Sequence, residues 1–232
     1  VAQSVYYFYA YFRFGVESNL NFSVPTGNFG DIYAGYVAKK MGLPINKLII
    51  ATNNNDILKR VLNTGVYKPL KVKHTISPSM DIKVASNFER LIYDACSYDS
   101  KEKLRIMNDL KKKGQFTLKK ENLDKIRKNF FSESLSEDET KLVINKIYKI
   151  EGILIDRHTA VAVGAADKIS LEDDTAVLAT AHPAKFSDVV MKETSIKPEL
   201  PENLKKTLNQ KEKVKNLPKD LKKVKDYIMD RA

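Results

Sequence analysis

The segment from residue 18 to residue 63 alternates between apolar strands and helices, and this alternation constrains the fold more than any other feature. Residues 21–25 (NFSVP) and 47–52 (KLIIAT) are short buried-type runs that are typical of strands. Residues 31–41 between them have helical periodicity, and Gly42-Leu43-Pro44 would end that helix. A second helix follows the second strand. This order predicts an α/β fold with a parallel sheet and right-handed crossovers.

The remaining sequence predicts further divisions of the chain. Residues 100–150 are rich in Lys and Glu and largely helical, with expected helix starts at Thr117 and at Ser136, where Glu139 completes a capping box. We predict four parts: residues 1–99 as the first part of an α/β domain, 100–150 as a helical insertion, 151–191 as the return to that domain, and 192–232 as a C-terminal helical tail.

Charge and composition exclude several classes of protein. The net charge of +11 is concentrated in residues 101–130 (+7) and 192–232 (+5), where lysines at helical spacing are typical of solvated helix faces. We therefore expect no nucleic-acid partner. No apolar run approaches the length of a membrane-spanning helix, so no membrane partner is expected. The single cysteine, Cys96, excludes a disulfide framework, and we expect a cytoplasmic protein because nothing reads as a secretory signal.

The strongest local signal is the segment Ser23-Val24-Pro25-Thr26-Gly27-Asn28-Phe29-Gly30-Asp31. A strand ends in a loop with two glycines, and a helix begins at once. Backbone N–H groups at a helix N-terminus attract anions, and glycine lets the backbone approach a phosphate closely. The segment is neither a P-loop nor a dinucleotide fingerprint. On spacing alone, a phosphate site and a plain tight turn are about equally favoured.

Three further segments carry candidate polar groups. Thr180 ends a strand expected at residues 175–180, where a parallel sheet places its ligands, although a hydroxyl that caps its own turn is the commoner case. Ser79, Asn87 and Arg90 suit a phosphate or a carboxylate, although Glu89 and Arg90 could equally be a surface or packing pair at the start of a helix. The segment Asp156-Arg157-His158-Thr159 precedes a helix rich in small residues, and a helix cap is favoured there.

Other chemistries find little support in the sequence. The three histidines, His74, His158 and His182, are far apart and have no cysteine partner, so we expect no metal site. The sequence lacks a Gly-x-Ser-x-Gly nucleophile motif, which disfavours hydrolase chemistry.

Taken together, these segments resemble threonine synthase of the longer fungal and bacterial type. The resemblance rests on VPTGNFGDIYAGYVAKKMGLPINKLIIATNNNDIL, ISPSMDI, SNFERL, DRHTAVAVGAA and LATAHPAKF, in this order. It implies a pyridoxal-phosphate-dependent enzyme of fold type II, similar to the tryptophan synthase β subunit, with a parallel twisted sheet flanked by helices. It further implies conversion of O-phospho-L-homoserine and water to L-threonine and phosphate, the last step of threonine biosynthesis.

The resemblance also assigns residues. Gly27, Asn28, Phe29, Gly30 and Asp31 match the loop that holds the cofactor phosphate, and Thr180 matches the hydroxyl at the pyridine nitrogen. Ser79, Asn87 and Arg90 become candidates for contact with the substrate. Arg157 is a departure, because the family usually has Pro between the acidic residue and the histidine.

The Schiff-base lysine of the family lies in a Ser-Phe-Lys-Asp context that this sequence lacks. Since the chain also opens on Val1 within an apparent helix, we expect a C-terminal portion of a longer protein that has no catalytic lysine and is inactive alone. The missing N-terminal half would be its partner. Two alternatives stay open: a threonine-synthase-like phospho-lyase, and a catalytically inactive fragment that packs against a partner.

Overall fold

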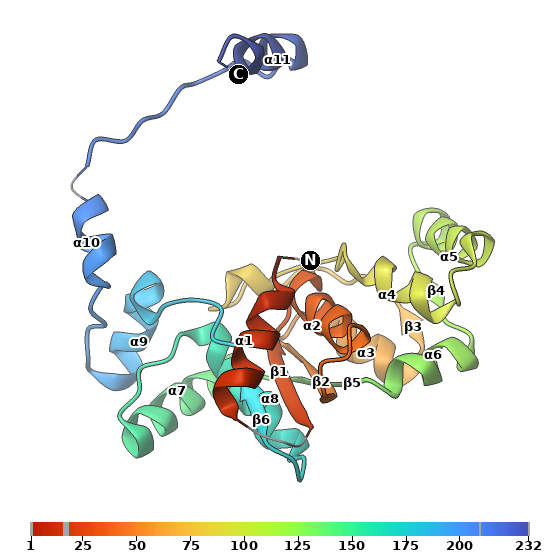
Figure 1. Ribbon diagram of the computed structural model, residues 1–232, viewed down its shortest axis with the longest axis horizontal. Coiled ribbons are helices and arrows are strands. Elements are labelled where there is room, and N and C mark those ends of the chain that lie inside the picture. The colour runs from red at the N-terminus through yellow and green to blue at the C-terminus, as the bar shows by residue number, and fades with distance from the viewer. Residues whose placement is uncertain (1, 16–18, 209, 232) are drawn as a thin grey trace. The chain divides into compact units, whose positions relative to one another are not determined.

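The computed structural model describes residues 2–15, 19–208 and 210–231. The chain divides into two compact units, Val1–Pro198 and Glu199–Ala232, which are described separately. The second unit holds the helices α10 (Glu202–Leu208) and α11 (Leu221–Met229), both labelled in Figure 1. Within the described residues, no helix is both long enough and apolar enough to cross a membrane.

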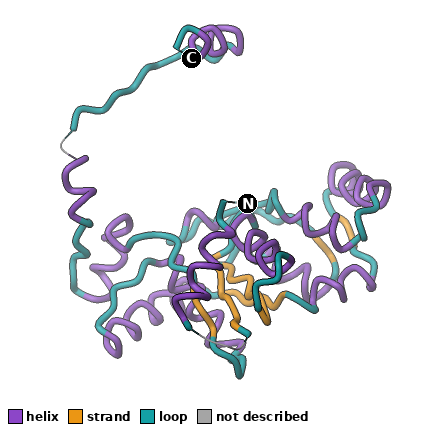
Figure 2. The backbone as a smooth tube through the Cα atoms, in the orientation of Figure 1, coloured by secondary structure: helices purple, strands orange, loops and turns teal. Residues whose placement is uncertain are grey.

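The first unit is organised around a parallel sheet of four strands, drawn in orange in Figure 2. Its strand order is β5-β2-β1-β6, and each neighbouring pair is parallel. The strands are β1 (Leu20–Pro25), β2 (Ile45–Thr52), β5 (Phe130–Ser134) and β6 (Thr175–Val177). The parallel sheet that the sequence predicts is therefore confirmed.

Helices and two short 3-10 turns surround this sheet. They are α1 (Ser4–Phe14), α2 (Gly30–Lys40), α3 (Ile57–Thr64), η1 (Pro78–Met80), α4 (Phe88–Ala95), α5 (Ser100–Lys113), α6 (Lys120–Arg127), α7 (Glu137–Glu151), α8 (Arg157–Ile169), η2 (Pro183–Phe186) and α9 (Ser187–Thr194). A small antiparallel ribbon pairs β3 (Val66–Tyr67) with β4 (Phe116–Thr117).

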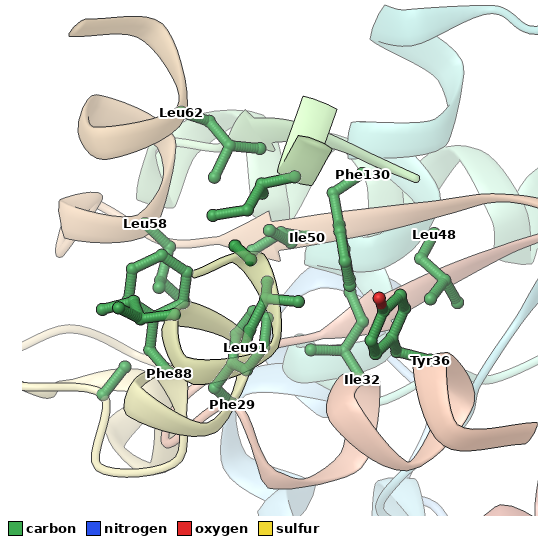
Figure 3. Packing of buried hydrophobic residues seen from close by; sticks show 14 of the residues in the cluster. Phe29, Ile32, Tyr36, Leu48, Ile50, Leu58, Leu62, Phe88, Leu91 and Phe130 are labelled. Carbon is green, nitrogen blue, oxygen red and sulfur yellow. The ribbon is translucent and has the colours of Figure 1, made fainter. Parts of the chain in front are cut away.

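Strand β2 is buried on both of its faces. Leu48 and Ile50 belong to the larger core, which includes the labelled aromatic residues of Figure 3. Ile49 and Ala51 point to the other side, where they pack against small residues of α8 such as Ala162. Alternate side chains of a strand point to opposite faces, so a fully apolar run suits a strand covered by helices on both sides.

Helix α8 lies close to the sheet because its inner face carries small side chains. The Ser23 hydroxyl in β1 donates a hydrogen bond to the Ala162 carbonyl at 2.6 Å. A Cβ atom added to Gly164 would lie 2.3 Å from a methyl carbon of Leu135, so this position has no room for a side chain. The small-residue helix expected at 160–167 is thus part of the core.

The segment 100–150 is more than a helical insertion. It contains β5, which pairs with β2 at the edge of the main sheet. This strand escaped prediction because only its first two residues, Phe130 and Phe131, are apolar, and Phe131 is exposed. Thr117 is the last residue of β4 and does not start a helix, since α6 begins at Lys120.

Three further boundaries predicted from the sequence can be compared with the structure. The capping box of Ser136 and Glu139 at the start of α7 is confirmed, with both of its hydrogen bonds present. The strand expected at 175–180 is shorter, because β6 ends at Val177. The tail expected from residue 192 differs as well, since α9 extends to Thr194 and its end is buried in the first unit.

Candidate functional site

The loop from Thr26 to Gly30 joins the end of β1 to the start of α2. Thr26 fixes its beginning, because the Thr26 N–H donates to the Ala51 carbonyl at 2.8 Å and the Thr26 hydroxyl donates to the Val24 carbonyl at 2.7 Å. The loop therefore stands at the carboxyl edge of two adjacent parallel strands, where ligands of such sheets bind. We call residues 26–31 the cradle.

Both glycines of the cradle have close neighbours, and the contact at Gly27 is with the backbone. A Cβ atom added to Gly27 would lie 2.6 Å from the Ser79 carbonyl oxygen, a backbone atom. A Cβ atom added to Gly30 would lie 2.9 Å from Oδ1 of Asn28, which accepts a hydrogen bond from the Gly30 N–H at 2.8 Å. The turn η1 is thus pressed against the cradle through its backbone.

Phe29 has a backbone conformation that is uncommon for a residue with a side chain. Its φ is 71°, in the left-handed region, and it is the N-cap of α2. Its ring is buried and packs on Phe88 and Phe130, with centroid distances of 5.2 Å and 5.9 Å. Figure 3 shows this aromatic group. Core packing therefore holds a strained turn in place, as is common at functional sites.

The cradle offers hydrogen-bond donors. Within the described residues, the backbone N–H groups of Asn28, Phe29 and Asp31 have no acceptor. They stand at the N-terminus of an 11-residue helix, whose dipole favours negative charge there. The glycines and these donors fit a phosphate group.

The Asp31 carboxylate is turned towards α1. The Tyr7 hydroxyl donates to the Asp31 carbonyl at 2.9 Å and lies 3.3 Å from its Oδ1. Burial raises the pKa of the Asp31 carboxyl, and the bond from Tyr7 opposes this rise. Asp31 thus joins two helices through its side chain and can serve the cradle through its backbone N–H.

Two of the predicted substrate residues lie beside the cradle. The Asn28 carbonyl accepts hydrogen bonds from the backbone N–H of Asn87 at 3.0 Å and from its side-chain amide at 3.2 Å. The Asn87 Oδ1 accepts from Arg90 Nε at 3.1 Å. A cavity of about 390 Å³ is lined by these three residues together with Gly30 and Asp31. The structure thus brings Asn87 and Arg90 to the cradle, while Ser79 touches it through its backbone and its side chain is exposed.

A polar cluster that the sequence analysis missed fixes the loop carrying Ser79. The amide of the buried Asn53 donates to Ser77 Oγ at 2.9 Å and to Asp81 Oδ1 at 2.8 Å. The other oxygen of Asp81 accepts from the Thr75 N–H at 2.7 Å, and Asn55 adds a bond to Oδ1 at 2.9 Å. This cluster ties the end of β2 to residues 75–81 and so sets the position of the Ser79 carbonyl.

Thr180 lies just past β6, the neighbour of β1 in the sheet. The Leu178 N–H still donates to the Ser23 carbonyl at 3.0 Å, which continues the pairing with β1. Thr180 itself is exposed, and its side chain has no hydrogen bond to the described residues. Its place is at the same edge of the sheet as the cradle.

The predicted helix cap before α8 is confirmed and includes a histidine. The buried Asp156 carboxylate accepts from the N–H groups of His158 and Thr159 at 2.9 Å and 3.0 Å. Oδ2 of Asp156 also lies 2.6 Å from Nδ1 of His158. Burial raises the pKa of Asp156, but the hydrogen bonds from His158 and Thr159 outweigh it and lower the pKa. Nε2 of His158 is buried and has no partner within the described residues.

Candidate metal ligands do not cluster among the described residues. No group of three or more His, Cys, Asp or Glu side chains there could hold an ion. The one cysteine, Cys96, is buried, and this burial raises the pKa of its thiol.

Comparison with known proteins shows that this chain is similar to threonine synthases. The family profile described as "Threonine synthase, C-terminal" matches residues 159–228. Threonine synthase from Pseudomonas aeruginosa is 40% identical over 232 residues, covering 98% of this chain and 50% of the relative. Threonine synthase from Saccharomyces cerevisiae is 44% identical over 258 residues, again covering 98% of this chain and 50% of the relative.

A solved structure agrees with this result. The structure of PLP-bound threonine synthase from Brucella melitensis has a TM-score of 0.91 and 44% identity, covering 99% of this chain and 50% of that chain. The chain spans about half the length of the relatives it matches. The resemblance to threonine synthases is therefore confirmed, and so is fold type II, an α/β fold with a parallel sheet flanked by helices.

Proposed function

We propose that this chain, which is similar to threonine synthases along almost its whole length, is the C-terminal portion of such an enzyme. The complete protein would use pyridoxal 5′-phosphate to convert O-phospho-L-homoserine and water to L-threonine and phosphate. The observation that carries this proposal is the cradle: N–H donors without an acceptor among the described residues, at a helix N-terminus and in a loop where Gly27 leaves no room for a side chain.

The cradle would hold the phosphate of the cofactor. The N–H groups of Asn28, Phe29 and Asp31 would donate to its oxygens, and Gly27 and Gly30 keep the approach open. When bound, the cofactor supplies an electron sink for negative charge at the substrate α-carbon. Thr180 would place a hydroxyl at the pyridine nitrogen, which leaves that nitrogen largely uncharged in comparison with a carboxylate partner.

Arg90 is the best candidate for the substrate phosphate. Its Nε is used by Asn87, whereas its terminal nitrogens have no acceptor among the described residues. A guanidinium with free N–H groups suits a phosphate. Asn87 would orient Arg90, and Ser79 would offer a hydroxyl from the neighbouring turn.

Proton transfer would come from outside this sequence. None of its lysines stands in the Ser-Phe-Lys-Asp context of the family. We propose that the other half of the complete protein provides this lysine and is the partner of this chain. A cytoplasmic setting fits the single, free Cys96.

The test uses the complete protein with added pyridoxal phosphate and O-phospho-L-homoserine. Formation of threonine together with equimolar phosphate supports the proposal. Release of phosphate with 2-oxobutanoate and ammonia in place of threonine would instead indicate a phospho-lyase. The variant Arg90→Met should raise KM for the substrate and leave cofactor absorbance unchanged, because Arg90 does not belong to the cradle. A wild-type protein that binds no cofactor would overturn the proposal.

A further inference from the structure

Arg157, at the start of α8, has a side chain with an unusual environment. The guanidinium carbon lies 4.0 Å from the centroid of the Phe186 ring. The same ring lies 4.9 Å from the ring of His158. Phe186 closes the turn η2, which follows Thr180 by a few residues. Two successive side chains at the start of α8 thus hold one aromatic ring.

The contact with Phe186 is the main interaction of this guanidinium. Arg157 forms no ion pair within the described residues, and its Nε is buried without a partner. Burial lowers the pKa of Arg157, while Asp188, Asp156 and Asp81 act against this shift. Cation–π contacts are strongest when the cation is partly removed from water.

The turn that carries Thr180 has few other attachments. At one end, the pairing with β1 ends at the bond from Leu178 to Ser23. Within the turn, His182 bonds only locally, accepting from the Ala184 N–H at 3.2 Å. At the other end stands Phe186, packed on the start of α8. The position of residues 179–182 therefore depends on the sheet on one side and on Phe186 on the other.

We propose that Arg157 is a positioning residue for Thr180. Stacked on Phe186, it docks the turn of residues 179–186 on the N-terminus of α8 and so sets where the Thr180 hydroxyl lies. This inference rests on the proposed function, because it assumes that Thr180 meets the pyridine nitrogen. A residue without a cation at this position would lack this contact with Phe186.

The fold offers a test that leaves α8 intact. Arg157 occupies the first helical position, its backbone N–H has no acceptor among the described residues, and Asp156 has the extended conformation (φ −79°, ψ 164°) that precedes proline readily. Arg157→Pro therefore removes the cation without breaking the helix. Arg157→Met keeps an unbranched apolar chain without the charge, and Arg157→Lys keeps a cation.

The experiment compares these variants in the complete protein with bound cofactor. Arg157→Met and Arg157→Pro should retain cofactor, because the cradle is untouched, but should shift its absorbance spectrum and lower kcat about threefold or more. Arg157→Lys should lie between them and wild type. Amide hydrogen exchange over residues 179–186 should become faster in Arg157→Met, with or without cofactor. Lys192→Met, an exposed charge loss on α9, is the matched control.

The outcomes separate the two proposals. Unchanged exchange in Arg157→Met shows that the turn is not docked by this residue and overturns the inference. Faster exchange with a wild-type spectrum and kcat also overturns it, because the turn would then not position Thr180. A wild-type protein without cofactor affinity overturns the proposed function, and the positioning role with it.

Discussion

The substitution Gly27→Ala tests whether the tight contact between the cradle and η1 governs cofactor binding. The added Cβ would lie 2.6 Å from the Ser79 carbonyl oxygen, whereas ordinary contacts begin at 3.4 Å. The two backbones must therefore separate by about 0.8 Å, in a region packed as densely as a crystal. Ser79 cannot yield freely, because Asn53 and Asp81 fix the loop that carries it.

Overpacking of this kind lowers the free energy of unfolding by about 1–3 kcal/mol. A shift of nearly 1 Å in the cradle should also weaken cofactor binding about tenfold or more, which corresponds to roughly 1.4 kcal/mol. Both quantities are measured on the complete protein: the dissociation constant by titrating pyridoxal phosphate and following absorbance, and the free energy of unfolding by urea denaturation.

Gly164→Ala is the matched control, since its Cβ would meet the Leu135 side chain at 2.3 Å in the packing between α8 and the residues after β5. It should lose stability in the same range and keep the cofactor affinity of wild type. A Gly27→Ala protein with wild-type affinity would refute the reasoning. So would an equal loss of affinity in Gly164→Ala, because the effect would then be one of general stability.

Three further predictions concern single side chains. Thr180→Asp should still bind cofactor but lose about tenfold or more in kcat/KM for threonine formation, whereas Thr180→Ser, which keeps the hydroxyl, should lose much less. Asp81→Ala leaves the Thr75 N–H without its acceptor and removes one of the acceptors of the Asn53 amide, so urea denaturation should show a loss of about 2 kcal/mol; a loss below 1 kcal/mol would contradict the role of the cluster. Because hydrogen bonds lower the pKa of Asp156, its stabilisation is present above the unfolded pKa of about 4 and is lost as pH falls through the folded pKa. Unfolding measured against pH should therefore show a shallower acid decline in Asp156→Asn than in wild type, and parallel curves would contradict this.

Local patterns were sufficient to predict the elements around the cradle and several others. The apolar run of β2, the helical periodicity after Gly30 and the Ser136 capping box each lie within about a dozen residues of sequence. The glycine-rich turn was visible for the same reason. Spacing alone did not separate a phosphate site from a plain turn; the left-handed Phe29 and the free N–H donors are features of the folded backbone.

Contacts between distant segments were beyond the reach of the sequence. Asn53 meets Asp81 across 28 positions, and Phe186 meets Arg157 from another part of the chain. Strand β5 is short and has only one buried apolar residue, so neither periodicity nor length marked it. The run Asn53-Asn54-Asn55 directly after a strand was the one available sign that polar groups converge there.

The proposed phosphate end of the cofactor site is held by the main core, whereas the proposed pyridine end lies in an exposed turn. The cradle is built on Phe29, which is buried between Phe88 and Phe130 in the main core, and its donors are backbone groups that no surface substitution removes. Thr180 lies in an exposed turn whose docking depends on Phe186 and Arg157. Substitutions that destabilise the core should therefore weaken cofactor binding. Substitutions of a few residues at the start of α8 should instead change the reactivity of the bound cofactor. Substitution of Arg157 should therefore alter the reactivity of the bound cofactor and leave the cradle unaltered.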